Sequence, residues 1–239
     1  MSLQPERVDR TVVVTAHPDD VDFGAGGTIA RWVEEGAEVF YCIVTDGDAG
    51  GSDPSVPRPE MAAIRREEQR KAAQVLGVGD VTFLGYPDGR LMPSIELRCD
   101  IARVIRHYRP DRLVCQSPER NWERIGTSHP DHRVAGDAAL DAVYPDARNP
   151  FAHPELLASG LQPHVVKEVW VMGSPTPNTY VDVTDTFERK LAALRCHESQ
   201  LQPIDDLEGM LRKWLASSAR QGELPEGRLA EAFRRVPTG

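Results

Sequence analysis

The sequence predicts a single α/β domain with a mainly parallel sheet that is flanked by helices. The first observation is the alternation of short β-branched runs, such as 12–14, 39–45 and 112–116, with longer segments of helical periodicity. The second is that no internal repeat, low-complexity tract or change in composition divides the chain. Together they indicate one Rossmann-like domain, expected to span residues 10–239 after an N-terminal tail of residues 1–9.

The expected strands are short runs rich in valine, isoleucine and threonine, the residues that fit a buried pleated surface. They lie at 12–14, 39–45, 81–84, 112–116 and 167–172, and an edge strand is expected at 180–183. Helices are expected between them because apolar residues recur there at helical spacing, and glycines end several of these segments. The expected helices are 28–35, 60–76, 95–106, 134–143, 155–157, 187–201 and 207–217, followed by a polar tail from 221 to 239.

The composition limits the classes of function. A chain of 239 residues with 40% hydrophobic and 27% charged residues has the make-up of a globular domain. The formal net charge of −9 argues against nucleic acid as a partner, because phosphate binding needs a basic face. No apolar run is long enough to span a membrane, and the N-terminus carries no apolar signal region.

Cysteine usage indicates the compartment. Cys42, Cys99, Cys115 and Cys196 lie far apart without a CxxC pair, which favours free thiols in a reducing cytoplasm. A cytoplasmic location is therefore expected. The sequence leaves open whether the chain forms a homo-oligomer.

The first chemical motif is Ala-His-Pro-Asp-Asp at residues 16–20, directly after the first strand. Functional groups of α/β sheets collect beyond the carboxyl ends of the strands. His17 and Asp20 are ligand types that zinc accepts, and Asp19 lies between them with no obligation to bind. A simpler interpretation remains open here, in which Asp19 or Asp20 caps the following helix.

The second motif is Ser-His-Pro-Asp-His at residues 128–132, before an alanine-rich helical segment. The two clusters can jointly supply three ligands and leave one coordination position open, as in a catalytic zinc site. The alternative is that Asp131 caps the helix and that His129 and His132 are surface residues.

These two motifs resemble those of the PIG-L/LmbE-like family, the zinc-dependent N-deacetylases of N-acetylglucosamine conjugates. Segments 64–68, 86–91 and 173–185 support the resemblance, which covers about residues 10–200. It implies one zinc ion per chain, bound by His17, Asp20 and His132.

The resemblance also implies roles for further residues. Asp19 is expected to be the general base, and His129 the acid or the oxyanion donor. Asp131 is expected to hold a histidine in the required tautomer, as carboxylates beside metal ligands do. Arg65 and Asp88 are expected to bind the substrate through its sugar hydroxyls. Without the resemblance, Arg65 has the pattern of a solvated helix charge and Asp88 that of a Pro-Asp-Gly turn.

Two departures from the family pattern stand in the sequence. Many members have glutamate after the aspartate pair, whereas this chain has Val21 and Asp22. Some sugar deacetylases carry a tyrosine that helps polarise the carbonyl, and here that place is Thr127. Its absence leaves more of that task to His129.

The function expected from the sequence is zinc-dependent hydrolysis that removes an N-acyl group, with acetyl the expected one, from an amino-sugar conjugate. One alternative is a nucleotide-binding oxidoreductase, because glycines follow the first strand; it needs GxGxxG directly after that strand, and the His-Pro-Asp-Asp turn intervenes. Another is a magnesium-dependent phosphoacceptor signalling module, which leaves the second motif unexplained. The aglycone, the pathway and the native metal, zinc or iron, stay open.

Overall fold

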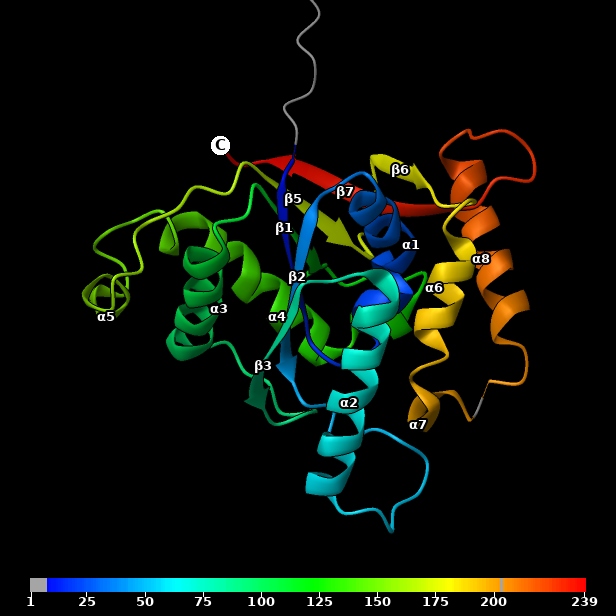
Figure 1. Ribbon diagram of the computed structural model, residues 1–239, viewed down its shortest axis with the longest axis horizontal. Coiled ribbons are helices and arrows are strands. Elements are labelled where there is room, and N and C mark those ends of the chain that lie inside the picture. The colour runs from blue at the N-terminus through cyan, green and yellow to red at the C-terminus, as the bar shows by residue number, and fades with distance from the viewer. Residues whose placement is uncertain (1–7, 203) are drawn as a thin grey trace, which may run out of the picture.

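A twisted sheet lies at the centre of the computed structural model, which describes residues 8–202 and 204–239 (Figure 1). Within these residues the sheet has seven strands in the order β3-β2-β1-β4-β5-β7-β6. Strands β1 to β5 run parallel, and β7 runs antiparallel to both β5 and β6. The strands are β1 Arg10–Thr15, β2 Glu38–Thr45, β3 Asp80–Tyr86, β4 Arg112–Gln116, β5 Glu168–Met172, β6 Thr179–Asp182 and β7 Ala230–Pro237. The predicted α/β class and the mainly parallel sheet are confirmed.

Helices cover both faces of the sheet, which makes three layers (Figure 1). On one side lie α1 Asp20–Glu34, α2 Arg58–Leu76 and α6 Phe187–Leu194, with α8 Leu207–Gln221 beside α6. On the other side lie α3 Ile95–Tyr108 and α4 Pro130–Asp141, and α5 Pro154–Ala158 is farther out. The remaining short elements are α7 Glu198–Leu201 and the single turns at 125–128 and 142–146.

The alternation of side chains along β1 explains why both faces need helices. Val12 and Val14 belong to the core beneath α3 and α4, whereas Val13 belongs to the core beneath α1 and α2. All three are fully buried, because successive strand residues point to opposite faces of the sheet. A strand that is apolar on both faces is typical of a parallel sheet enclosed between helices.

The order of the strands fixes where a site can form. From β1 the chain passes to β2 on one side of the sheet, and later returns to pair β4 with the other side of β1. At such a switch point, the loops after the two central strands diverge and leave a crevice at the carboxyl ends. The segments that follow β1 and β4 contain the two histidine motifs.

The first helix begins earlier than the sequence predicted. It starts at Asp20 rather than at residue 28, so glycines form part of its interior. A Cβ on Gly24 would lie 2.7 Å from Sδ of Met172, and one on Gly27 would lie 2.8 Å from Cβ of Val183. These glycines allow a close approach between α1 and its neighbours, which offsets their weak helix propensity.

Two predictions for the C-terminal third were wrong. The expected helix 187–201 is broken, because α6 ends at Leu194 and α7 resumes at Glu198. The polar tail contains β7, which lies inside the sheet between β5 and β6. Its Glu231 is buried and forms an ion pair with the buried Lys190 at 2.6 Å. The polar sequence of this segment therefore does not indicate a buried strand, because the partner that neutralises Glu231 lies in a distant part of the sequence.

The four cysteines are free thiols, in agreement with the sequence. Cys42 and Cys115 lie within β2 and β4, and Cys196 is partly exposed. In the part of the chain that the structure describes, no helix has the length and apolarity needed to cross a membrane. Residues 1–7 of the predicted N-terminal tail lie outside the described residues.

Candidate active site

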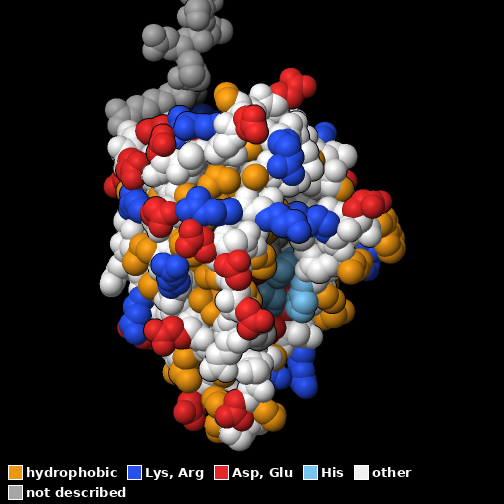
Figure 2. Space-filling model, turned by 90° about the vertical axis from the view of Figure 1, so that its right-hand side faces the viewer, with side chains coloured by type: hydrophobic (Ala, Val, Ile, Leu, Met, Phe, Trp, Pro, Cys, Tyr) orange, Lys and Arg blue, Asp and Glu red, His pale blue; other side chains and the backbone are white. Residues whose placement is uncertain are grey.

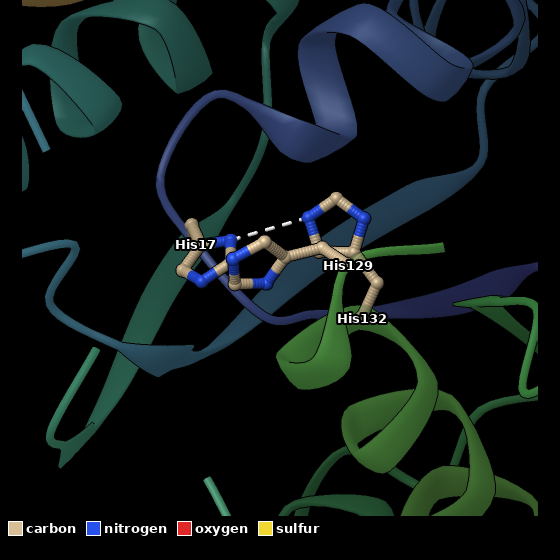
Figure 3. Close-up of side chains that lie close together, drawn as sticks. All are labelled: His17, His129 and His132. Carbon is tan, nitrogen blue, oxygen red and sulfur yellow. Dashed lines mark hydrogen bonds between the residues drawn. The ribbon is translucent and has the colours of Figure 1, made fainter. Parts of the chain in front are cut away.

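Three imidazoles converge at the carboxyl ends of β1 and β4 (Figure 3). His17 comes from the loop after β1, and His129 and His132 come from the beginning of α4. Nδ1 of His17 lies 3.2 Å from Nε2 of His132, and the ring centres of His17 and His129 are 5.0 Å apart. On the face of the molecule that carries α8, histidine side chains are visible inside a recess (Figure 2).

The carboxylate of Asp20 joins the two histidines. Its Oδ2 lies 3.2 Å from Nδ1 of His17 and accepts the backbone N–H of His17 at 2.8 Å. Its Oδ1 lies 3.1 Å from Nε2 of His132. Asp20 is therefore directed toward the histidines, and the helix-capping interpretation does not describe it.

The rings of His17 and His132 face each other through their inner nitrogens, Nδ1 of His17 and Nε2 of His132. Their outer nitrogens already have hydrogen-bond acceptors, which determines what the inner nitrogens can do. Nε2 of His17 faces Oδ1 of Asp88 at 3.1 Å and Oδ2 of Asp131 at 3.3 Å. Nδ1 of His132 faces the carbonyl oxygen of Thr127 at 3.4 Å. If each neutral ring donates its outer N–H to these acceptors, the inner nitrogens present lone pairs to each other.

This arrangement fits a metal ion. Two lone pairs and a carboxylate then meet with no donor among them, and a cation satisfies all three. Donor atoms on a tetrahedral zinc with bonds of roughly 2.0–2.2 Å lie roughly 3.3–3.5 Å apart. The closest separations among His17, Asp20 and His132 are 3.1–3.2 Å, slightly shorter than that spacing, and a different oxygen of Asp20 faces each ring. These side chains thus form a His/Asp site suited to a metal ion.

The electrostatics of the site also favour a positive charge. Burial alone lowers the pKa of His17, but Asp20, Asp131 and Asp88 outweigh burial and raise that pKa to about 12. Burial raises the pKa of Asp20, yet contact with His132 and His17 brings it well below its usual value. Because a metal ligand must be deprotonated, a metal ion competes with the proton for Nδ1 of His17.

Asp131 supports the histidines and does not cap α4. Its carboxylate accepts backbone N–H groups from Gly89 at 2.7 Å and Leu91 at 3.3 Å, besides facing His17. The residue that caps α4 is His129, whose Nδ1 accepts the backbone N–H of Asp131 at 3.2 Å. The predicted contact between Asp131 and a histidine is therefore present in the geometry.

The same bond determines the tautomer of His129. With Nδ1 acting as an acceptor, the proton of the neutral ring lies on Nε2. Burial lowers the pKa of His129, and positive charge on His17 and His132 lowers it further. His129 is consequently set up as a neutral donor rather than an imidazolium.

Asp19 has an unusual backbone and a largely buried carboxylate, with 15% of the side-chain surface exposed. Its φ of 85° lies in the left-handed region, which costs a residue with a Cβ about 1–3 kcal/mol. Its side chain makes no capping bond to α1. Burial raises the pKa of Asp19 to about 6, with Arg65 opposing the rise and Asp20 adding to it. A carboxylate with a pKa near neutrality suits general-base chemistry.

Arg65 is buried, with 4% of its surface exposed, and it is directed toward Asp19. Nη2 donates to Oδ2 of Asp19 at 3.1 Å and to the carbonyl oxygen of Pro18 at 2.7 Å. Nη1 donates to the carbonyl oxygen of Gly47 at 3.0 Å. Arg65 is therefore no solvated helix charge, and its guanidinium is largely occupied within the protein.

Asp88 lies on the other side of His17. One oxygen faces Nε2 of His17, and the other accepts the backbone N–H of Ala49 at 3.2 Å. The nearest guanidinium nitrogen of Arg65 is 4.0 Å away. The implied role of Arg65 and Asp88 in binding sugar hydroxyls stays a prediction.

A second group of polar residues lies behind Asp19, and nothing in the sequence indicated it. These residues are fully buried and contact one another or the backbone of α1, and they are Asp22, Gln69, Lys190 and His197. Neither motif spacing nor helical periodicity marks them, because their partners come from distant elements. The nearest signal was Asp22, noticed only as a departure from the family pattern.

A cavity of about 460 Å³ opens beside the metal site. It meets the site at Asp20 and His132, and extends between the loop after β4, the loop after β5 and helix α8. This volume lies within the usual range of small-molecule sites. Its apolar lining is formed by Phe23, Met172, Pro175, Pro177, Trp214 and Leu215.

This fold and its His/Asp site define an α/β protein with a site suited to a metal ion at the carboxyl ends of its central strands. Residues 12–143 match the model of a family described as PIG-L, GlcNAc-PI de-N-acetylase. Diacetylchitobiose deacetylase from Thermococcus kodakarensis is 36% identical to this chain, and the match covers 96% of this chain and 84% of that protein. The chain belongs to the PIG-L family.

Solved structures agree with this assignment. N,N'-diacetylchitobiose deacetylase from Pyrococcus horikoshii, complexed with its inhibitor MPG, superposes with a TM-score of 0.89 at 34% identity. That match covers 97% of this chain and 85% of the other. The 4-carboxy-2-hydroxymuconate hydratase from Pseudomonas putida has a TM-score of 0.79 at 22% identity over 95% of this chain and 96% of its own. This second likeness shows a shared fold alone.

Proposed function

We propose that this protein removes the acetyl group from an N-acetylglucosamine unit of a small saccharide by zinc-dependent hydrolysis. The observation that carries the proposal is the convergence of His17, Asp20 and His132, with closest distances of 3.1–3.2 Å, beside the carboxylate of Asp19. The named deacetylase that is 36% identical over nearly the whole chain supports the choice of substrate class.

In this proposal His17, Asp20 and His132 hold the zinc ion. When bound, zinc supplies Lewis acidity and lowers the pKa of water toward neutrality. Asp19 accepts the proton of the attacking water, whose oxygen forms the new bond to the acyl carbon. Its pKa of about 6 leaves the carboxylate largely ionised near neutral pH.

His129 acts at the acyl oxygen. Its Nε2–H stabilises the negative charge that develops there, as a neutral donor oriented by the bond to its Nδ1. The C–N bond then breaks, and the proton held by Asp19 leaves with the amine, so that acetate and a free amino sugar are formed. Asp131 holds His17 in the tautomer that keeps Nδ1 free for the metal.

The cavity provides room for the rest of the substrate. It begins at Asp20 and His132, where the amide must lie, and leads away to Trp214 on α8. On the opposite side of the site, Asp88 is the proposed contact for hydroxyls of the sugar that carries the amide, whereas the guanidinium of Arg65 is engaged by Asp19, Pro18 and Gly47. A saccharide can thus extend in two directions from the bond that is cut.

The other interpretations have less support. A hydratase shares the fold, but at 22% identity that likeness carries no reaction. A dinucleotide-binding turn is disfavoured because Asp20 begins α1 and its carboxylate lies at the helix N-terminus, where a pyrophosphate would bind. A phosphoacceptor module leaves the histidines of α4 without a task.

The experiment that tests the proposal measures metal content and acetate release together. The purified protein is expected to carry about one zinc per chain and to release acetate from N,N'-diacetylchitobiose or N-acetylglucosamine. His132→Ala should lower zinc affinity by orders of magnitude and abolish release, because one of three protein ligands is lost. Full zinc occupancy in His132→Ala would contradict the ligand assignment, and absence of acetate from a zinc-loaded wild type would contradict the substrate class.

A further inference from the structure

Three fully buried side chains form a series of hydrogen bonds that leads to Asp19 from behind the site. Oε1 of Gln69 accepts the backbone N–H of Asp19 at 2.8 Å, and Nε2 of Gln69 donates to Oδ2 of Asp22 at 2.8 Å. Nε2 of His197 lies 2.8 Å from the same oxygen of Asp22. Gln69, Asp22 and His197 are each 0% exposed. They come from α2, α1 and the break between α6 and α7.

The donors and acceptors in this series of hydrogen bonds allow a single orientation of the side-chain amide of Gln69. The backbone N–H of Asp19 can only donate, so it takes the oxygen of Gln69, which leaves the NH₂ group of Gln69 for the carboxylate of Asp22. Gln69 must therefore turn its oxygen to Asp19 and its NH₂ group to Asp22. His197 completes the order, because its Nε2–H donates to Asp22 and holds that carboxylate in place.

Asp19 needs such support. Its φ of 85° places it in the left-handed region, and its side chain makes no bond to the backbone of α1 that would hold this turn. Arg65 holds the carboxylate, but only Gln69 accepts the N–H of the same residue among the described contacts. The direction of the Asp19 side chain depends on both its carboxylate and its backbone N–H being held in place.

We propose that Gln69, Asp22 and His197 are positioning residues, which hold the backbone of Asp19 so that its carboxylate faces the attacking water. The proposal rests on the function given above for Asp19 as the base. It assigns a task to the break between α6 and α7, since a continuous helix would not present His197 at this point. It also explains why a buried carboxylate, Asp22, stands two residues after the metal ligand Asp20.

The main test is Gln69→Met, which keeps the length of the side chain and removes both of its hydrogen bonds. Turnover is expected to fall about 10- to 100-fold, with KM and zinc content unchanged, because a base displaced by about 1 Å transfers protons poorly. The matched control is Glu68→Gln. Glu68 is the neighbouring buried residue of α2 and holds α7 through Ser199, at 2.7 and 2.8 Å, without touching Asp19. Its turnover should stay within about threefold of the wild type.

A second pair of variants tests His197. His197→Gln can place an amide N–H where Nε2 stood and should keep turnover within about threefold, whereas the shorter His197→Asn should lose about as much as Gln69→Met. The double variant Gln69→Met/His197→Asn should be no worse than Gln69→Met alone, because His197 acts through Gln69.

The outcomes separate the positioning proposal from the proposed function. If Gln69→Met and Glu68→Gln lose turnover equally, the hydrogen bonds of Gln69, Asp22 and His197 contribute only to the packing between α2 and α7. Unchanged turnover in a zinc-loaded Gln69→Met would lead to the same conclusion. Additive losses in the double variant would remove His197 from the series. If the zinc-loaded wild type itself releases no acetate, the proposed function fails first, and thermal unfolding of Gln69→Met against Glu68→Gln then shows only the packing contribution.

Discussion

Nη2 of Arg65 lies 3.1 Å from Oδ2 of Asp19, and the guanidinium also holds the carbonyl oxygens of Pro18 and Gly47. A buried charged bond of this kind fixes the carboxylate in one direction and opposes the rise in its pKa that burial causes. Arg65 thus contacts the proposed base more closely than it contacts Asp88, at 4.0 Å.

This contact predicts how Arg65→Ala behaves on two substrates. The variant should lower kcat/KM by about 10- to 100-fold on an N-acetylglucosamine saccharide and by a similar factor on a small non-sugar acetamide, because Asp19 loses its partner in both reactions. The measurement is kcat/KM for each pair of enzyme and substrate. A loss confined to the sugar would instead establish Arg65 as a contact to hydroxyls, as the family resemblance implies.

The two adjacent aspartates should separate metal binding from proton transfer. Asp19→Asn is expected to keep its zinc and lose about 10²–10⁴ in kcat, the usual contribution of a positioned base. Asp20→Asn should lose zinc, because its carboxylate bridges His17 and His132. Zinc content by elemental analysis and kcat with saturating zinc provide the two readouts. Identical behaviour of the two variants in both readouts would contradict the division of roles.

The sequence predicted which of the motif side chains lie together, because their positions follow local order. His17 and Asp20 stand directly after a strand, and His132 stands in the first turn of a helix, so two short motifs and the rule of strand ends suffice to bring them together. It could not predict Gln69 or His197. Their partners lie 47 or more residues away and are selected by the packing of α1, α2 and α6, which no single-sequence spacing encodes.

The missed strand β7 has the same cause. Residues 230–237 contain Glu231, Arg234 and Arg235, a pattern typical of a solvated tail. In the fold, Glu231 meets Lys190 and accepts the backbone N–H groups of Gly27 and Thr28 at 3.0 and 2.7 Å. Burial of the Glu231 carboxylate in this strand is favourable because α1 and α6 supply its hydrogen-bond and ion-pair partners.

The pair formed by His197 and Asp22 predicts a dependence of stability on pH. Burial lowers the pKa of His197, but Asp22, Asp19 and Glu68 outweigh burial and raise it above its usual 6.5. A raised pKa in the folded state means that this stabilisation is complete below about pH 6.5 and is lost as the pH rises through the folded-state value.

The check compares thermal unfolding of the zinc-loaded wild type and of His197→Gln between about pH 5 and about pH 9. The wild type should be the more stable at low pH, and the difference in Tm should shrink as the pH rises. Glu68→Gln removes one of the carboxylates that raise the pKa of His197, so in this variant the stabilisation should be lost at a lower pH than in the wild type. A difference between the wild type and His197→Gln that grows with pH would show that His197 is neutral in the folded state.

Trp214 is predicted to decide how well a second sugar ring is accepted. Its ring lines the cavity that starts at Asp20 and His132, and the guanidinium of Arg124, from the loop after β4, lies 4.6 Å from the ring centre. The two side chains join that loop to α8 and form part of the wall of the cavity. Trp214→Ala should lower kcat/KM on N,N'-diacetylchitobiose about 10-fold, the effect of losing roughly 1.4 kcal/mol of apolar contact.

The same variant should change kcat/KM on N-acetylglucosamine by less than about threefold, because a monosaccharide has no second ring to contact Trp214. The control is Trp122→Ala, since Trp122 is 78% exposed in the same loop and does not line the cavity. Both substrates should be cleaved normally by Trp122→Ala. Equal losses of Trp214→Ala on the two substrates would mean that α8 supports the site as a whole and that the cavity does not hold the second ring.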